Sequence, residues 1–299
     1  MSLNAHTKKA ALGRTALIAT TLIWGTSFVI LKNTLDSFSA IYLLALRFTI
    51  SALIMAVAGF KQLKNIDRKT LTAGAALGVF IFLAYVLQTY GLVYTTPGKN
   101  AFLTATYCII TPFLARLIDK TRLSAFNILA AFICIAGIGL VSLRGDFTIG
   151  IGDLLTVFCG LFYALHLIFT GRVAGKSSIL MLTMIQFIVA GALSWIAALI
   201  AEPVPSSISA SAIWSILYLS IFCTCICFGL QTLGQKYTSS SAASIILTLE
   251  SVFGAAISAV FYHEILTMQL LLGFLLIFAA IIISETKLSF LKRKKQRVV

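Results

Sequence analysis

Long apolar runs, separated by short polar or basic segments, form the dominant pattern along the chain. Each run is long enough to cross about 30 Å of hydrocarbon as a helix. The ten runs cover residues 15–35, 40–60, 71–94, 100–118, 124–143, 151–171, 178–201, 212–235, 241–261 and 267–285. This pattern predicts an all-α polytopic membrane protein with ten transmembrane helices.

The second half of the chain repeats the first. An offset of 143 places residues 88–95, QTYGLVYT, over residues 231–238, QTLGQKYT, and an offset of 139 places residues 46–52 over residues 185–191. The repeat predicts two five-helix units, residues 1–144 and 150–287, followed by a basic cytoplasmic tail at 288–299. Because five crossings is an odd number, the second unit must be inverted in the membrane. Inverted repeats are typical of secondary transporters, whose site lies near the bilayer midplane.

Composition agrees with a membrane protein and the charges indicate its orientation. The chain is 60% hydrophobic and 11% charged, whereas soluble domains contain about 25% charged residues. The net charge of +14 would also suit nucleic-acid binding, but 19 of the 23 Lys and Arg fall in tails and loops on one side. This asymmetry predicts that both termini are cytoplasmic in a multi-pass protein of the inner (plasma) membrane. The basic residues would then contact membrane lipids, so we expect no nucleic-acid partner.

The cysteine positions and the absence of catalytic motifs argue against several classes of function. All six cysteines fall within predicted spans, and residues 223–227, CTCIC, would point successive side chains to different faces of a helix. We therefore expect no metal site and no cofactor. The chain carries no H-E-x-x-H or G-x-S-x-G motif, so an intramembrane enzyme is not predicted. The pattern holds no signal for an oligomeric state.

Three segments identify a family resemblance. Residues 22–28, LIWGTSF, residues 100–115, NAFLTATYCIITPFLA, and residues 247–264, LTLESVFGAAISAVFYHE, resemble the two EamA-type repeats of the drug/metabolite transporter superfamily. The resemblance covers about residues 12–286. It implies a ten-helix inner-membrane carrier, often an exporter of metabolites or amino acids, whose central cavity is lined by the first, third, fourth, sixth, eighth and ninth spans. The family usually has a proline after the glutamate of the ninth span, where this chain has Ser251.

Polar residues deep in the apolar runs are candidates for the substrate site, because such side chains face the protein interior or a water-filled cavity. Glu250 lies 14 positions from the nearest charge on either side, which is about 21 Å of helix. The repeat offsets pair Glu250 with Tyr107 and suggest further pairs. The full set of predicted substrate-binding residues is Glu250, Arg47, Trp24, Tyr85, Gln88, Tyr107, Tyr163, His166, Gln186 and Gln231.

Two interpretations of Glu250 remain open at this point. Its carboxylate can take up and release a proton, or bind a substrate cation. Alternatively, it is permanently ionised and paired with Arg47, or satisfied by the hydroxyls of Thr248 or Ser251. Arg47 does not deprotonate, so it requires an anion, either a substrate carboxylate or Glu250 itself. Pro112 is expected to kink the fourth span.

These features predict a secondary active transporter of small metabolites. One mid-membrane cation and one anion favour a zwitterionic small-molecule substrate, such as an amino acid or a related compound, moved by alternating access with protons as the candidate coupling ion. The direction, export, rests on the family resemblance alone. The alternative with the same fold is a multidrug or organic-cation exporter, and the alternatives from another class are a channel or an intramembrane enzyme.

Overall fold

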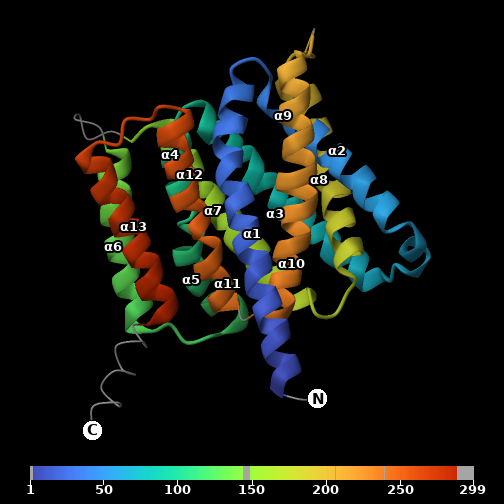
Figure 1. Cartoon of the computed structure of the whole chain (residues 1–299), viewed down its shortest axis with the longest axis horizontal. Coiled ribbons are helices and arrows are strands. Elements are labelled where there is room, and N and C mark those ends of the chain that lie inside the picture. Colours follow the sequence, from blue (N-terminus) through green and yellow to red (C-terminus); the bar gives the residue numbers. More distant parts are fainter. Residues whose placement is uncertain (1–2, 144–148, 206, 239, 288–299) are drawn as a thin grey trace.

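Every predicted span is helical in the computed structural model, which describes residues 3–143, 149–205, 207–238 and 240–287 (Figure 1). The basic tail and residues 144–148 of the predicted linker lie outside the described residues. The helical elements are α1 (Leu3–Leu35), α2 (Ala40–Ala58), η1 (Phe60–Asn65), α3 (Arg68–Val93), α4 (Pro97–Thr104), α5 (Tyr107–Asp119), α6 (Ala125–Ser142), α7 (Ile151–Val173), α8 (Ile179–Ala201), α9 (Ala210–Ser220), η2 (Ile221–Ile226), α10 (Cys227–Tyr237), α11 (Ser240–Leu247), α12 (Leu249–Phe261) and α13 (Met268–Thr286).

Three of the ten predicted spans are not single regular helices. The fourth span consists of α4 and α5, the eighth of α9, η2 and α10, and the ninth of α11 and α12. Within the described residues, nine helical stretches are long and apolar enough to cross a membrane, and residues 245–261 of the ninth span form a shorter apolar stretch. The chain is therefore an integral multi-pass membrane protein, and α11 and α12 together cover the ninth predicted span.

Each pair of packed helices has a counterpart, formed by the equivalent spans of the other half of the chain. The α2–α8 and α6–α13 contacts each join equivalent spans of the two halves. The α3–α7 contact has its counterpart in α1–α10, and the α1–α12 contact in α5–α7. The bundle therefore has an approximate twofold relation between its halves. The start of α1 and the end of α13 lie at the same end, called here the terminal end, and the opposite end is called the distal end (Figure 1).

A carboxylate at the distal end joins the fourth and ninth spans, which are called here the two interrupted spans. Glu264 follows α12 and accepts hydrogen bonds from the Gly98 backbone N–H at 2.8 Å and from the Ser258 hydroxyl at 2.5 Å. Gly98 lies in the first turn of α4, where the backbone N–H groups have no partners within the helix and attract negative charge. Glu264 therefore fixes the start of α4 against the end of α12.

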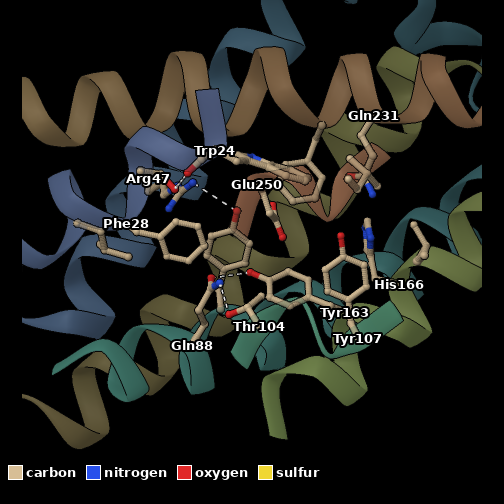
Figure 2. A pocket seen from close by; sticks show the side chains of 16 residues that line it. Trp24, Phe28, Arg47, Gln88, Thr104, Tyr107, Tyr163, His166, Gln231 and Glu250 are labelled. Atoms are coloured by element: carbon tan, nitrogen blue, oxygen red, sulfur yellow. Dashed lines mark hydrogen bonds between the residues drawn. The ribbon is translucent and has the colours of Figure 1, made fainter. Parts of the chain in front are cut away.

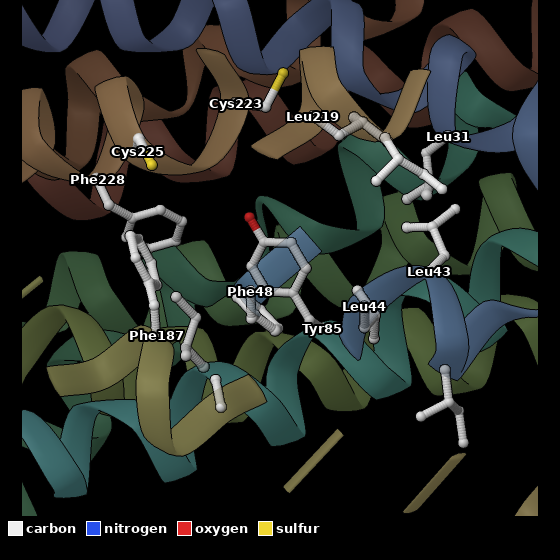
Figure 3. Close-up of a cluster of buried hydrophobic side chains, with 14 of the residues drawn as sticks. Leu31, Leu43, Leu44, Phe48, Tyr85, Phe187, Leu219, Cys223, Cys225 and Phe228 are labelled. Atoms are coloured by element: carbon white, nitrogen blue, oxygen red, sulfur yellow. The ribbon is translucent and has the colours of Figure 1, made fainter. Parts of the chain in front are cut away.

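An aromatic cluster fills the bundle between α2, α3, α8 and α10 (Figure 3). Phe48 packs edge-on against Tyr85, with ring centroids 5.4 Å apart, and stacks on Phe187 at 6.1 Å. Phe187 in turn meets Phe228 at 5.7 Å. Aromatic pairs in these geometries add to the stability that burial provides. The cluster forms a rigid wall on which Tyr85 and Phe228 are presented to the centre of the bundle.

Candidate functional site

The two interrupted spans break at equivalent positions. The fourth span leaves α-helical geometry at residues 105–106 and the ninth at Thr248, and the offset of 143 superimposes these breaks. After each break the next turn is tight, because the Cys108 N–H donates to Ala105 O at 3.1 Å and the Ser251 N–H to Thr248 O at 3.0 Å. Each donor and acceptor are three residues apart, rather than four as in an α-helix. Helices interrupted at mid-depth are a recurring feature of transporter sites.

The breaks do not coincide with proline. Pro112 lies inside α5, several residues beyond the interruption of its span. The ninth span has Ser251 where the family usually has proline, and it is interrupted nevertheless. Because of where the breaks lie, Tyr107 is the first residue of α5 and Glu250 is the second residue of α12. A carboxylate in the first turn of a helix is favoured by the helix dipole.

A cavity of about 40 Å³ lies at the centre of the bundle, between the two interrupted spans (Figure 2). Sixteen residues line it: Trp24, Ser27, Phe28, Leu31, Arg47, Tyr85, Gln88, Thr104, Tyr107, Tyr163, His166, Leu167, Phe228, Gln231, Leu247 and Glu250. They come from the six spans that the family resemblance implies and also from the second span, through Arg47.

The lining is itself nearly symmetric. Fourteen of the sixteen residues form seven pairs under the two repeat offsets: Trp24 and Tyr163, Ser27 and His166, Phe28 and Leu167, Tyr85 and Phe228, Gln88 and Gln231, Thr104 and Leu247, and Tyr107 and Glu250. The two residues without a partner in the lining are Leu31 and Arg47. Both halves of the chain therefore contribute equivalent surfaces to one cavity, but the side chains on those surfaces differ in charge.

Nine of the ten residues predicted from the sequence line this cavity, and that they bind substrate stays a prediction. Gln186 is the exception, since it lies behind the wall. Its Oε1 is hydrogen bonded to His166 Nε2 at 3.0 Å. Because an amide oxygen only accepts, Nε2 carries the proton. Gln186 therefore orients the His166 ring instead of facing the cavity.

Arg47 is held by neutral groups. Its Nε donates to Thr224 Oγ1 at 2.6 Å and its Nη2 to the Tyr85 hydroxyl at 3.3 Å. The guanidinium carbon lies 4.7 Å from the centroid of the Tyr85 ring, a cation–π distance. Thr224 lies in the π-helical turn η2, and its hydroxyl donates to Leu219 O, five residues earlier, at 2.8 Å. Such π-helical turns are frequent at functional sites.

Glu250 is not paired with Arg47. Among the described residues the ion pairs are Lys99–Asp153 and Arg172–Asp119. The hydroxyls of Thr248 and Ser251, the other partners considered, donate to the backbone oxygens of Ile245 and Thr248. No hydrogen bond from the part of the chain that the structure describes reaches the Glu250 carboxylate, which is 5% exposed and lines the cavity.

A polar network lies in the wall of the cavity that α3, α4 and α7 form. Gln88 Nε2 donates to Thr104 Oγ1 at 3.0 Å, and the Tyr163 hydroxyl donates to Gln88 Oε1 at 2.7 Å. These bonds join α3, α4 and α7 and fix the orientation of the amide. The counterpart amide, Gln231, has an Oε1 atom without a hydrogen-bond partner among the described residues. The described residues contain no group of three or more His, Cys, Asp or Glu that could hold a metal ion.

The sequence did not predict seven of the lining residues, nor the hydrogen bond between Arg47 and Thr224. The missed lining residues are Ser27, Phe28, Leu31, Thr104, Leu167, Phe228 and Leu247. Searching only for polar residues excluded the apolar ones. The repeat offsets would have found two of them, since they pair Tyr85 with Phe228 and His166 with Ser27. Nothing in the sequence signals the π-helical turn that brings Thr224 to Arg47.

A bundle of apolar helices, two of them interrupted around a central polar cavity, defines the class, a membrane transporter of small molecules. The model of the EamA-like transporter family matches residues 11–143 and 150–286. The chain belongs to this family.

Individual relatives agree with this assignment. The chain is 33% identical over 270 residues to an uncharacterized transporter of Archaeoglobus fulgidus, covering 90% of this chain and 84% of the relative. It is 22% identical over 286 residues to the uncharacterized transporter YoaV of Bacillus subtilis, covering 93% and 97%. A solved crystal structure shares the fold, with a TM-score of 0.69 at 16% identity over 95% of this chain and 99% of the other.

Proposed function

We propose that the protein is a secondary carrier of small zwitterionic metabolites, such as amino acids, and that it uses protons as the coupling ion. The observation that carries the proposal is that Glu250 and Arg47 line one cavity and do not neutralise each other. A zwitterion offers a carboxylate to the guanidinium and an ammonium group to the carboxylate. A proton on Glu250 would compete with the ammonium group, which couples the two ligands at one site.

We further propose that the carrier is an exporter in the plasma membrane with its terminal end in the cytoplasm. The distribution of Lys and Arg supports this orientation. The approximate twofold relation between the units 1–144 and 150–287 supports alternating access, in which one unit rocks against the other around a fixed site.

Proton release on substrate binding tests the role of Glu250. Amino acids are titrated into purified protein in weakly buffered detergent solution near neutral pH, and the released protons are measured with a pH indicator. We expect release from the wild type and none from Glu250→Gln. Asp119→Asn, which removes an exposed carboxylate paired with Arg172, is the matched control and should release protons as the wild type does. Equal binding without proton release in all three proteins would overturn the proposal.

An organic-cation exporter is the second candidate, because aromatic rings surround the carboxylate. Trp24 and Phe228 meet edge to face at 5.3 Å, and Tyr163 contacts the rings of Tyr85 and Tyr107. Such a wall can bind a lipophilic cation. Arg47→Met separates the two candidates. Loss of a charge-assisted hydrogen bond of about 1.5–3 kcal/mol should weaken amino-acid binding roughly tenfold or more, whereas removing a positive charge should strengthen the binding of a cation.

A further inference from the structure

The inverted repeat creates two equivalent routes out of the cavity, and their side chains differ. The first is the contact of α7 with α10 on the side of the terminal end, called here the terminal route, and the second is the contact of α1 with α3 on the side of the distal end, called here the distal route. On α10 the terminal route carries Gln231 and Gln235, which are one helical turn apart, and Thr238 follows the end of the helix. The offset of 143 places Gln235 over Leu92 of α3, which is fully buried.

The second helix of each route shows the same difference. On α7 the residue one turn beyond His166 is Thr170, which is 1% exposed. The offset of 139 places Thr170 over Leu31 of α1, which is 4% exposed and lines the cavity. Two leucines, Leu31 and Leu92, therefore occupy the distal route at the positions where the terminal route has a hydroxyl and an amide.

The polar groups of the terminal route lack partners. Gln235 Nε2 donates to Leu167 O at 3.2 Å, which shows that α10 faces α7 here. Its Oε1 atom, the Gln231 Oε1 atom and the hydroxyls of Thr170 and Thr238 have no hydrogen-bond partner among the described residues. Buried polar atoms in native proteins are nearly always hydrogen bonded, either to protein or to ordered water. The Thr238 hydroxyl faces Gly13 of α1, and the other three atoms lie along the interface of α7 and α10. Three unpartnered polar atoms along one helix interface are what a line of bound water molecules requires.

We propose that water molecules occupy the interface of α7 and α10 and connect the cavity with the terminal end, so that protons reach Glu250 from that end. The leucines of the distal route exclude water in the same conformation. The titratable or charged groups that share the cavity with Glu250 are Arg47, Tyr85, Tyr107, Tyr163 and His166. Of these, His166 lies at the mouth of the terminal route.

Thiol accessibility tests the water path without any substrate. Single cysteines are introduced as Thr170→Cys and Gln235→Cys, and the symmetry-related Leu31→Cys and Leu92→Cys are the matched controls. Purified protein in detergent, with both ends accessible, is treated with a small cationic methanethiosulfonate, and added label is counted by intact mass. The six native cysteines are all buried, so the wild type provides the blank. Each variant is first checked for a single symmetric peak in gel filtration.

We expect labelling at residues 170 and 235 to be at least roughly tenfold faster than at residues 31 and 92, since a thiol beside bound water forms the reactive thiolate more readily than a thiol in an apolar contact. Full labelling of all four after denaturation in detergent shows that each thiol is competent. Equal rates at the two pairs of positions, or no reaction at residues 170 and 235, would overturn the water path.

A second measurement tests the role of the path in coupling, which rests on the proposed function. The double variant Thr170→Val, Gln235→Leu replaces the Thr170 hydroxyl and the Gln235 amide, which carry two of the unpartnered oxygen atoms, by apolar groups of similar shape. In proteoliposomes it should slow substrate-driven proton flux at least roughly tenfold while leaving substrate affinity unchanged. Thr89→Val, which removes another buried and unpartnered hydroxyl, should leave the flux unchanged. Wild-type flux in the double variant would overturn the role in coupling, even where the thiols react.

Discussion

The two ends of the bundle are closed by the same backbone contact but by different side chains. At the distal end α3 crosses α7 where Gly91 meets Gly152, and a Cβ on Gly152 would lie 2.7 Å from Gly91 O. At the terminal end α1 crosses α10 where Gly13 meets Gly234, and a Cβ on Gly13 would lie 3.2 Å from Gly234 O. The repeat offsets superimpose the two crossings. Small residues allow this close approach of helices within a membrane.

Beside these crossings, and within the described residues, side-chain bonds hold the distal end but not the terminal end. Asp153 accepts hydrogen bonds from Thr95 Oγ1 at 2.5 Å and from Lys99 Nζ at 3.0 Å. At the terminal end Arg14 stands at the position equivalent to Asp153, and Thr238, equivalent to Thr95, has an unpartnered hydroxyl. Alternating access requires each end to open in turn. We therefore expect the terminal end to open more readily, which agrees with the proposed water path on that side.

Adding a methyl group at each crossing should give the largest difference in stability between the two ends. In Gly152→Ala the new Cβ meets backbone atoms of Gly91 and Tyr94, so α3 and α7 must separate, at a cost of about 1–3 kcal/mol. In Gly13→Ala the nearest atom is the Thr238 hydroxyl oxygen at 2.7 Å, which can rotate away. We expect a clearly lower midpoint of thermal unfolding in detergent for Gly152→Ala than for Gly13→Ala. Equal midpoints would contradict the assignment of the distal crossing as the more rigid one.

Neutralising the distal carboxylate should shift the balance between the two ends by a smaller amount. Asp153→Asn keeps an acceptor for Thr95 but removes the attraction to Lys99, whose side chain is 25% exposed. Because solvent screens this pair, we expect a change of about 1 kcal/mol, or roughly fivefold, in favour of the open distal end. Double electron–electron resonance between spin labels at the exposed residues 94 and 151 measures the open fraction.

A double-mutant cycle provides the control for this shift. Lys99→Met should open the distal end to a similar extent, and the double variant should open it no further than either single change, because both changes remove the same interaction. Additive effects would mean that Asp153 and Lys99 act independently, and the ion pair would then not hold the distal end.

The fold could be predicted from the sequence because the bilayer constrains it so strongly. Ten apolar runs and a tandem repeat with an odd number of crossings leave few architectures, and the predicted boundaries lie within a few residues of most observed helices. The interruption of the ninth span was not predictable from proline, since Ser251 occupies the usual proline position. Its cause is the tight turn after Thr248, which the sequence does not signal.

The charged and amide members of the candidate site could be predicted, because burying such a group in a membrane span costs free energy and so indicates a function or a partner. Glu250, Arg47 and the paired glutamines were found in this way. The hydroxyls of Ser27 and Thr104 carry no such signal. The partners of Arg47 could not be predicted, because they depend on the π-helical turn that rotates Thr224 towards it. Nor does a pattern of single residues reveal that Leu31 and Leu92 block one route, since the meaning of a leucine there depends on its symmetry-related counterpart.

Providing the terminal end with an acceptor should have the smallest effect and should make the two ends more alike. Arg14→Asp places a carboxylate at the position equivalent to Asp153, within reach of the unpartnered Thr238 hydroxyl. Arg14 is exposed, so the gain in stability of the closed terminal end should be about 0.5–1 kcal/mol. Gly13 and Gly234 already bring the two backbones together, hence no further helix movement is needed. Thermal unfolding should give midpoints in the order Arg14→Asp, Arg14→Asn, Arg14→Ala, from highest to lowest. If Arg14→Ala stabilises the protein as much as Arg14→Asp does, relief of positive charge is the cause, and the missing acceptor does not explain the weaker closure of the terminal end.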